Sequence, residues 1–134
     1  LVASAIANDG VLMRPYVVDA VTDRAGGIIS ETSPRPWRTA LDQATAERVT
    51  DMMVTVVRSG SGGRAAIPGV NVAGKTGTAE VGKNVGTHAW FIAFAPAEKP
   101  RVAVAIVLEN AGVGGGVAAP AARTVLEAAL AVTQ

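Results

Sequence analysis

The 134-residue sequence contains no cysteine, which excludes a disulfide framework, a thiolate nucleophile and a cysteine-ligated metal site within it. Aromatic residues make up only 4%, and charged residues, at 17%, fall below the roughly 25% of ordinary soluble domains. Because 49% of residues are hydrophobic, much of the chain must be buried, and a disordered tail is excluded. The formal net charge is only +1 and no cluster of Lys and Arg stands out, so nucleic-acid binding is not expected.

No continuous apolar stretch reaches the roughly 20 residues that a membrane-spanning helix needs. The richest apolar run, residues 102–108, has the length of a strand, and the first residues do not form a signal-peptide pattern. The chain starts at Leu1 rather than at a methionine, in what resembles the last turns of an alanine-rich helix. We therefore expect these residues, about one domain's worth, to be a piece of a longer protein.

The first third of the chain predicts a helix and then a hairpin. Residues 1–8 have a helical composition that stops at a turn cluster ending in Gly10. Residues 16–21 and 28–30 flank a glycine-containing turn and together predict a short hairpin. Two closely spaced prolines then predict a loop over residues 33–36.

The clearest amphipathic helix follows this hairpin. Thr45 is its expected N-cap, and Gly60 is the expected residue just beyond its C-terminus. Its apolar positions recur with helical spacing at Val49, Met52, Met53, Val56 and Val57. A glycine-rich loop over residues 61–63 comes next.

Three strands are expected in the second half, over residues 70–81, 89–95 and 101–108, with a turn over residues 82–86 between the first two. In the last two strands the residues on both faces are apolar, so both faces of the sheet should be covered.

A helix at the C-terminal end supplies one cover. Residues 112–116 are expected to be a flexible link, and Pro120 suits the first turn of the helix. The apolar stripe of this helix consists of Ala122, Val125, Leu126, Ala129 and Leu130. The sequence therefore predicts the α+β class, with an antiparallel sheet covered by helices on both faces.

Three residues at or next to the start of the second expected strand have structural interpretations. Trp90 and Phe91 are expected in the core rather than on a stacking surface. His88 is the single histidine and lacks a second ligand nearby, so it is expected to be structural. No group of His, Asp and Glu has metal-ligand spacing, and neither a metal nor a cofactor is expected.

The segment from Gly69 to Glu80 carries the chemistry, and it has competing interpretations. Gly69 with Gly74-Lys75-Thr76 matches the P-loop pattern of nucleotide-binding proteins. A P-loop lies between a buried strand and a helix, because loop N–H groups and the helix N-terminus bind the phosphates. Here no buried strand precedes the match, and the glycines and β-branched residues after it form a poor helix. A nucleotide-binding protein is therefore a distant alternative.

In a second interpretation, Lys75-Thr76-Gly77-Thr78 belongs to a strand that lines an active site. Lys75 would place a positive charge beside an anionic substrate terminus or a nucleophile's proton. The hydroxyls of Thr76 and Thr78 share strand parity and could bind one carboxylate, while Gly77 leaves room for substrate. The Thr78 N–H, if unpaired at a sheet edge, could stabilise an oxyanion. Strict alternation places Lys75 opposite Thr76, so its side chain must curl round an edge or the strand must twist.

Taken as four residues alone, the motif favours a third interpretation, an ordinary amphipathic strand with Lys75 and both threonines in solvent. The surrounding sequence is more specific. Residues 73–80, followed by residues 88–96, closely resemble the class B penicillin-binding proteins, which are bacterial cell-wall D,D-transpeptidases. The likeness covers nearly the whole chain and is greatest to the actinobacterial branch of the family. It also includes residues 5–10, 56–63, 67–69 and 115–120.

The family signature has three parts, S-x-x-K, S-x-N and K-[ST]-G, of which only the third is present, at Lys75-Thr76-Gly77. The resemblance therefore implies that residues 1–134 are the C-terminal portion of a penicillin-binding transpeptidase domain, whose penicillin-recognising fold is incomplete in this chain. The nucleophilic serine is expected outside this chain, on the remaining N-terminal part of the protein, which could also be a separate chain.

The resemblance also implies a function. The complete domain would cross-link peptidoglycan stem peptides through an acyl-enzyme, and β-lactams would acylate the same serine. Lys75 and Thr78 are then the expected catalytic residues, and Lys75, Thr76, Gly77 and Thr78 the expected substrate-binding residues.

Partners and location follow from the same resemblance. Cell-division and cell-wall proteins are further expected partners, and the domain is expected on the extracytoplasmic face of the cell membrane, with no anchor in this chain. A β-lactam sensor or a noncatalytic scaffold of the same fold stays open, because the missing segment would distinguish these roles from an enzyme.

Overall fold

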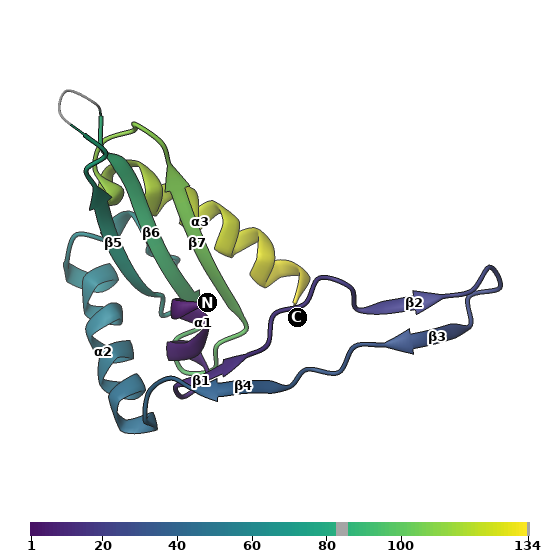
Figure 1. Ribbon diagram of the computed structural model, residues 1–134. Coiled ribbons are helices and arrows are strands. Elements are labelled where there is room, and N and C mark those ends of the chain that lie inside the picture. Colours follow the sequence, from purple (N-terminus) through teal and green to yellow (C-terminus); the bar gives the residue numbers. More distant parts are fainter. Residues whose placement is uncertain (83–85, 134) are drawn as a thin grey trace.

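The computed structural model describes residues 1–82 and 86–133, and the body of the molecule is one antiparallel sheet with helices on both faces (Figure 1). The strand order is β5–β6–β7, with β5 over Ala73–Ala79, β6 over His88–Ala95 and β7 over Val102–Leu108. The predicted α+β class and the covered antiparallel sheet are confirmed. The first strand is shorter than the expected 70–81, and the turn expected over residues 82–86 lies mostly outside the described residues.

Helix α3 (Gly114–Val132) covers one face of this sheet. Small residues of β6 lie beside large residues of β7 on that face, since the register pairs Ala93 with Val104 and Ala95 with Val102. The alanines let the helix approach closely, while the valines fill the space next to them. The helix buries Ala118, Ala119, Ala122, Leu126 and Leu130 in this interface.

The beginning of α3 differs from the sequence-based expectation. Residues 114–116 belong to the helix rather than to a flexible link, and Pro120 lies inside the helix rather than in its first turn. Pro120 has no N–H to donate to the carbonyl of Gly116, four residues earlier. Arg64 Nη1 donates to that carbonyl instead, at 2.8 Å. The side chain of Val125 is 44% exposed, so the predicted stripe was wrong at this position.

Helices α1 (Val2–Ala7) and α2 (Gln43–Ser59) cover the other face. Their contact with the sheet centres on a buried cluster of Ala3, Ile6, Met53, Ala73 and Phe94. The N-cap of α2 is Asp42, whose Oδ1 accepts the Thr45 N–H at 2.8 Å, so Thr45 is not the cap. Gly60 follows the helix as predicted, but Met52 of the predicted stripe is 60% exposed.

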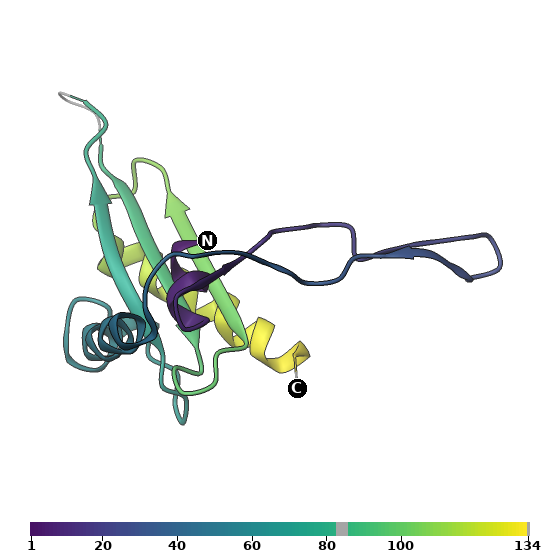
Figure 2. The same cartoon turned by 60° about the horizontal axis from the view of Figure 1, so that its bottom comes forward.

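A two-stranded arm projects away from the body (Figures 1 and 2). At its base, β1 (Val11–Met13) pairs with β4 (Pro36–Thr39), and farther out β2 (Ala20–Thr22) pairs with β3 (Ile28–Glu31). The predicted hairpin is therefore confirmed, although Pro36 belongs to β4 and not to a loop. Its exposed apolar side chains are Tyr16, Val17, Val18, Val21, Ile28, Ile29 and Trp37.

Helix α3 is long and apolar enough, by length and composition alone, to cross a membrane, so the expectation that no stretch meets this criterion was wrong. Alanines and glycines supply most of this apolar stretch. Because one side of the helix is buried against β6 and β7, we assign it to the core of the domain.

Candidate functional site

The Lys-Thr-Gly-Thr motif lies in β5, at one edge of the sheet. Its register with β6 pairs Lys75 with Ile92, Thr76 with Phe91 and Thr78 with Ala89. These residues form a continuous antiparallel strand and not a loop that opens a helix. The P-loop interpretation is therefore wrong, because no helix N-terminus stands after Thr76 to bind phosphates.

Lys75 extends along the strand to which it belongs. Its pairing with Ile92 places it on the face opposite Thr76, as strict alternation required. The ammonium nevertheless reaches the carbonyl oxygen of Thr76 and donates to it at 2.5 Å. The side chain thus curls from its own face to the backbone of the strand. This is one of the two arrangements that the alternation of Lys75 and Thr76 required, and it leaves the charge exposed.

The same contact bears on the backbone groups of Thr78. In an antiparallel pair, the N–H and C=O of one residue point to the same side, and this side alternates along the strand. The Thr78 N–H therefore points to the same side as the Thr76 carbonyl. Because that carbonyl is reached by the Lys75 ammonium, and β5 pairs with β6 alone among the described residues, we infer that both groups face the open edge.

The two threonines share a face but differ in surroundings. Thr76 is half-buried, and its Oγ1 lies 2.8 Å from Oγ of Ser61, in the loop after α2. Thr78 is exposed. The predicted parity of Thr76 and Thr78 is confirmed by their pairing with Phe91 and Ala89, which both belong to the face under α3.

Gly77 lies against Trp90, its partner in β6. A Cβ on Gly77 would stand 3.1 Å from Trp90 Cβ, which is tighter than ordinary contact. The side chain of Trp90 is 40% exposed, so its assignment to the core was wrong, whereas Phe91 is fully buried as predicted. Gly77, Trp90 and Lys75 lie on the same face of the sheet, where Gly77 has no side chain to cover the indole.

The first turn of α3 supports the motif from behind. A Cβ on Gly114 would overlap the carbonyl oxygens of Gly77 and Trp90, and one on Gly115 would overlap the carbonyl oxygen of Ser61. Both positions must therefore be glycine for the helix to approach this closely. The helix, the Ser61 loop and β5 meet at this point.

His88 has a structural contact at the start of β6. Its Nδ1 accepts the backbone N–H of Asn110 at 3.1 Å, which holds the turn after β7 against β6. Asn110 itself has a φ of 51°, the left-handed conformation that a tight turn requires. This contact agrees with the structural role expected for His88.

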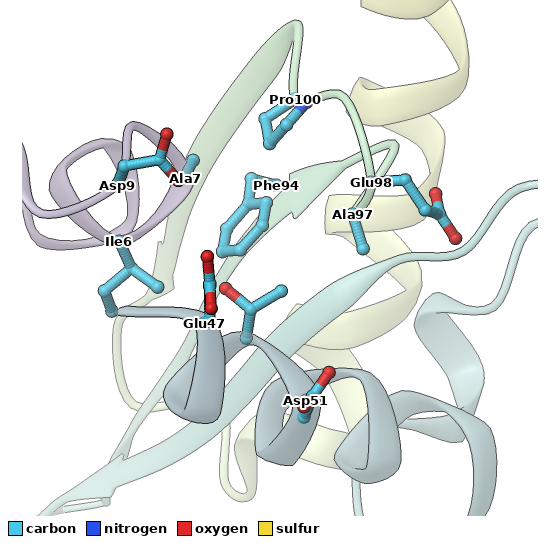
Figure 3. A pocket seen from close by; sticks show the side chains of 10 residues that line it. Ile6, Ala7, Asp9, Glu47, Asp51, Phe94, Ala97, Glu98 and Pro100 are labelled. Carbon is cyan, nitrogen blue, oxygen red and sulfur yellow. The ribbon is translucent and has the colours of Figure 1, made fainter. Parts of the chain in front are cut away.

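A cavity of about 260 Å³ lies between α1, α2 and the β6–β7 connection (Figure 3). The residues that line it include four acidic ones, Asp9, Glu47, Asp51 and Glu98, together with apolar residues such as Phe94. A hydrogen bond from Asn71 holds the pKa of Glu98 below its ordinary value. None of the four motif residues lines this cavity, and no group of metal-binding residues is found among residues 1–82 and 86–133.

The sequence did not indicate that Ser61, Arg64 and Gly114 lie around the Lys-Thr-Gly-Thr strand. Ser61 and Thr76 are 15 residues apart, and Arg64 and Gly116 are 52 apart, so no local spacing connects them. The signal that was present is compositional. Small residues gather in the segments 60–63 and 114–116, where backbones must come close together.

Comparisons with known proteins give a consistent assignment. Residues 2–127 match the family described as penicillin binding protein transpeptidase domain. Over 96% of its length the chain is 44% identical to the peptidoglycan D,D-transpeptidase PbpA of Mycolicibacterium smegmatis, of which it covers 28%.

Two solved structures are similar to this chain. The ceftriaxone acyl-enzyme complex of penicillin-binding protein A from M. tuberculosis matches with a TM-score of 0.91 and 43% identity, over 96% of this chain and 31% of that one. The D,D-transpeptidase domain of a peptidoglycan glycosyltransferase from Eggerthella lenta matches with a TM-score of 0.90 and 49% identity, over 98% and 30% respectively. The chain therefore spans less than a third of each of these proteins.

Proposed function

Because the chain belongs to the family of penicillin-binding protein transpeptidase domains, as residues 73–80 and 88–96 predicted, we propose that the complete protein is a serine D,D-transpeptidase. Residues 1–134 are then the C-terminal portion of its transpeptidase domain. The observation that carries the proposal is the Lys75-Thr76-Gly77-Thr78 strand at a sheet edge, in which Lys75 and Thr78 are exposed and the Lys75 ammonium donates to the Thr76 carbonyl.

The proposed reaction has two steps. A serine oxygen attacks the carbonyl between the two terminal D-Ala residues of a peptidoglycan stem peptide, the C–N bond breaks, and D-Ala leaves with a proton. An amine of a neighbouring stem peptide then attacks the acyl-enzyme, forms the cross-link and returns the serine. β-Lactams would acylate the same serine, since their ring carbonyl occupies the place of the scissile bond.

Each motif residue has a proposed role in this reaction. The positive charge of Lys75 stabilises negative charge in the site, and Lys75 takes part in the transfer of the nucleophile's proton. The hydroxyls of Thr76 and Thr78 bind the terminal carboxylate, and Gly77 keeps the strand open to the substrate. The Thr78 N–H donates to the developing oxyanion, an interaction whose loss typically costs about 2.7–4 kcal/mol of transition-state stabilisation.

The nucleophile would be supplied by polypeptide outside this chain. The sequence contains neither S-x-x-K nor S-x-N, and the chain covers 28% of its mycolicibacterial relative. We propose that the rest of the protein contributes both motifs and closes the pocket in front of β5. On the same grounds we propose an extracytoplasmic location at the cell membrane, with cell-wall and cell-division proteins as partners.

Labelling by a fluorescent penicillin tests the role of Lys75 in the complete protein. Lys75→Ala should nearly abolish labelling, whereas Lys99→Ala, which removes an exposed lysine from the β6–β7 connection, should leave it unchanged. Unchanged labelling of Lys75→Ala would refute the assigned role. Formation of cross-linked product from purified stem peptides separates a transpeptidase from a β-lactam sensor or a noncatalytic scaffold, which would be labelled without turnover.

A further inference from the structure

We propose that Ser61 is a positioning residue for the Thr76 hydroxyl, and through it for the carboxylate of the substrate. The inference deepens the proposed function and rests on it. Its starting point is the 2.8 Å hydrogen bond between Ser61 Oγ and Thr76 Oγ1, which joins the loop after α2 to the middle of β5.

The loop that carries Ser61 is held on several sides. The Gly62 N–H donates to the Val56 carbonyl at 3.0 Å, which folds the loop back on the end of α2. The Ser61 carbonyl lies so close to Gly115 that a Cβ there would overlap it. Arg64 fastens the far end of the loop to α3 through the Gly116 carbonyl. The Ser61 backbone is therefore fixed relative to β5 and α3.

A fixed partner matters because a threonine hydroxyl can rotate. The pair formed by Ser61 and Thr76 contains two protons, and one of them lies between the two oxygens. In the arrangement that we propose, Ser61 donates to Thr76 Oγ1, and the Thr76 proton is left to donate outward. A hydroxyl that already accepts a hydrogen bond is also a better donor. The pair thus presents one oriented donor, which suits a carboxylate because that group only accepts.

The substrate's negative charge makes the inference testable. Removing the Ser61 hydroxyl should slow reactions of ligands that carry the carboxylate and spare ligands in which it is masked. The experiment compares the second-order acylation rate constants of the complete protein with benzylpenicillin and with its methyl ester.

Ser61→Ala should reduce the rate with benzylpenicillin by about 3- to 10-fold, the value of one hydrogen bond, and leave the rate with the ester unchanged. Ser61→Thr restores a hydroxyl and should recover most of the rate. Ser59→Ala is the matched control, since the Ser59 hydroxyl donates to the Thr55 carbonyl of its own helix. In a Thr76→Val background, Ser61→Ala should have no further effect.

Equal rates for the wild-type protein and Ser61→Ala with benzylpenicillin would overturn the inference and leave the proposed function intact. An equal loss with the acid and the ester would also overturn it, since a general distortion of the site affects both. If benzylpenicillin does not acylate the wild-type protein at all, the proposed function fails and the role of Ser61 fails with it.

Discussion

Gly114, the first residue of α3, is packed against the backbone of Gly77 in the Lys-Thr-Gly-Thr strand. A Cβ on Gly114 would overlap the Gly77 carbonyl oxygen and stand 3.1 Å from the Gly77 nitrogen. The two glycines are 37 positions apart in the sequence, and Gly114 could not carry a side chain at this contact without displacing β5 or α3. The position of β5 is therefore set partly by the C-terminal helix.

Gly114→Ala tests this contact. The added methyl must push α3 away from β5, so we expect a loss of about 1–3 kcal/mol in the free energy of unfolding and weaker penicillin labelling of the complete protein. Gly116→Ala is the control two positions later, because a Cβ there meets nothing within 4 Å. Removing a glycine from the helix should stabilise it by about 0.5–1 kcal/mol. Equal effects of the two changes in denaturant unfolding would contradict the packing argument.

Two substitutions at Thr78 separate the role of its hydroxyl from the role of its backbone N–H. Thr78→Ala removes the hydroxyl and keeps the N–H, whereas Thr78→Pro removes the N–H that we assign to the oxyanion. Thr78→Pro should therefore slow acylation by about 100-fold or more, and Thr78→Ala by clearly less. Circular dichroism must first show that both variants are folded. If the two folded variants lose the same activity, the backbone N–H has no special role.

Arg64 supplies the hydrogen bond that Pro120 cannot. Arg64→Ala leaves the Gly116 carbonyl without this partner, and we expect a loss of about 0.5–1.5 kcal/mol in unfolding free energy, since water can partly replace the guanidinium. In a Pro120→Ala background the helix has its own N–H for that carbonyl. Arg64→Ala should then lower the unfolding free energy by less than it does in the wild-type background. An equal loss in both backgrounds would show that Arg64 stabilises the protein through a different contact.

Asp42 makes the stability of α2 depend on pH. Hydrogen bonds from the Thr45 side chain and N–H hold the pKa of Asp42 below its ordinary value of 3.8. The stabilisation is thus fully present above that value and is lost as pH falls through the lower pKa of the folded protein. Asp42→Ala should lower the melting temperature at pH 7 and have less effect at pH 3. Asp42→Asn retains a capping oxygen and should melt near the wild-type temperature at pH 7.

The strands were predicted well because alternation is a local property. The strand expected over residues 101–108 agrees with β7 to within one residue, because larger and smaller apolar side chains alternate along most of Val102–Leu108. The strand with the Lys-Thr-Gly-Thr motif was also predicted, and the pairing of Lys75 to Thr78 with β6 confirms it. The exposure of Trp90 was not predictable from its own strand, because its partner in the neighbouring strand is Gly77, which has no side chain to cover the indole.

Helix ends were predicted less well, for two different reasons. Asp42 and Thr45 can both cap a helix, and the apolar stripe, which starts at Val49, does not choose between them. At the other helix, the run of three glycines from Gly114 has low helix propensity. Contacts with β5 and the Ser61 loop override that propensity, and they connect residues too distant in sequence for a local pattern to reveal.

Because Gly114 and Gly115 pack against β5 and the Ser61 loop, the 19 residues of α3 help to hold the Lys-Thr-Gly-Thr strand in place, although none of them belongs to that motif. A premature stop codon after Leu108 would leave the Lys-Thr-Gly-Thr motif intact and still remove the helix that packs against its strand. Lesions in the part of the coding sequence that encodes α3 are therefore expected to abolish labelling by penicillin as completely as lesions in the motif itself.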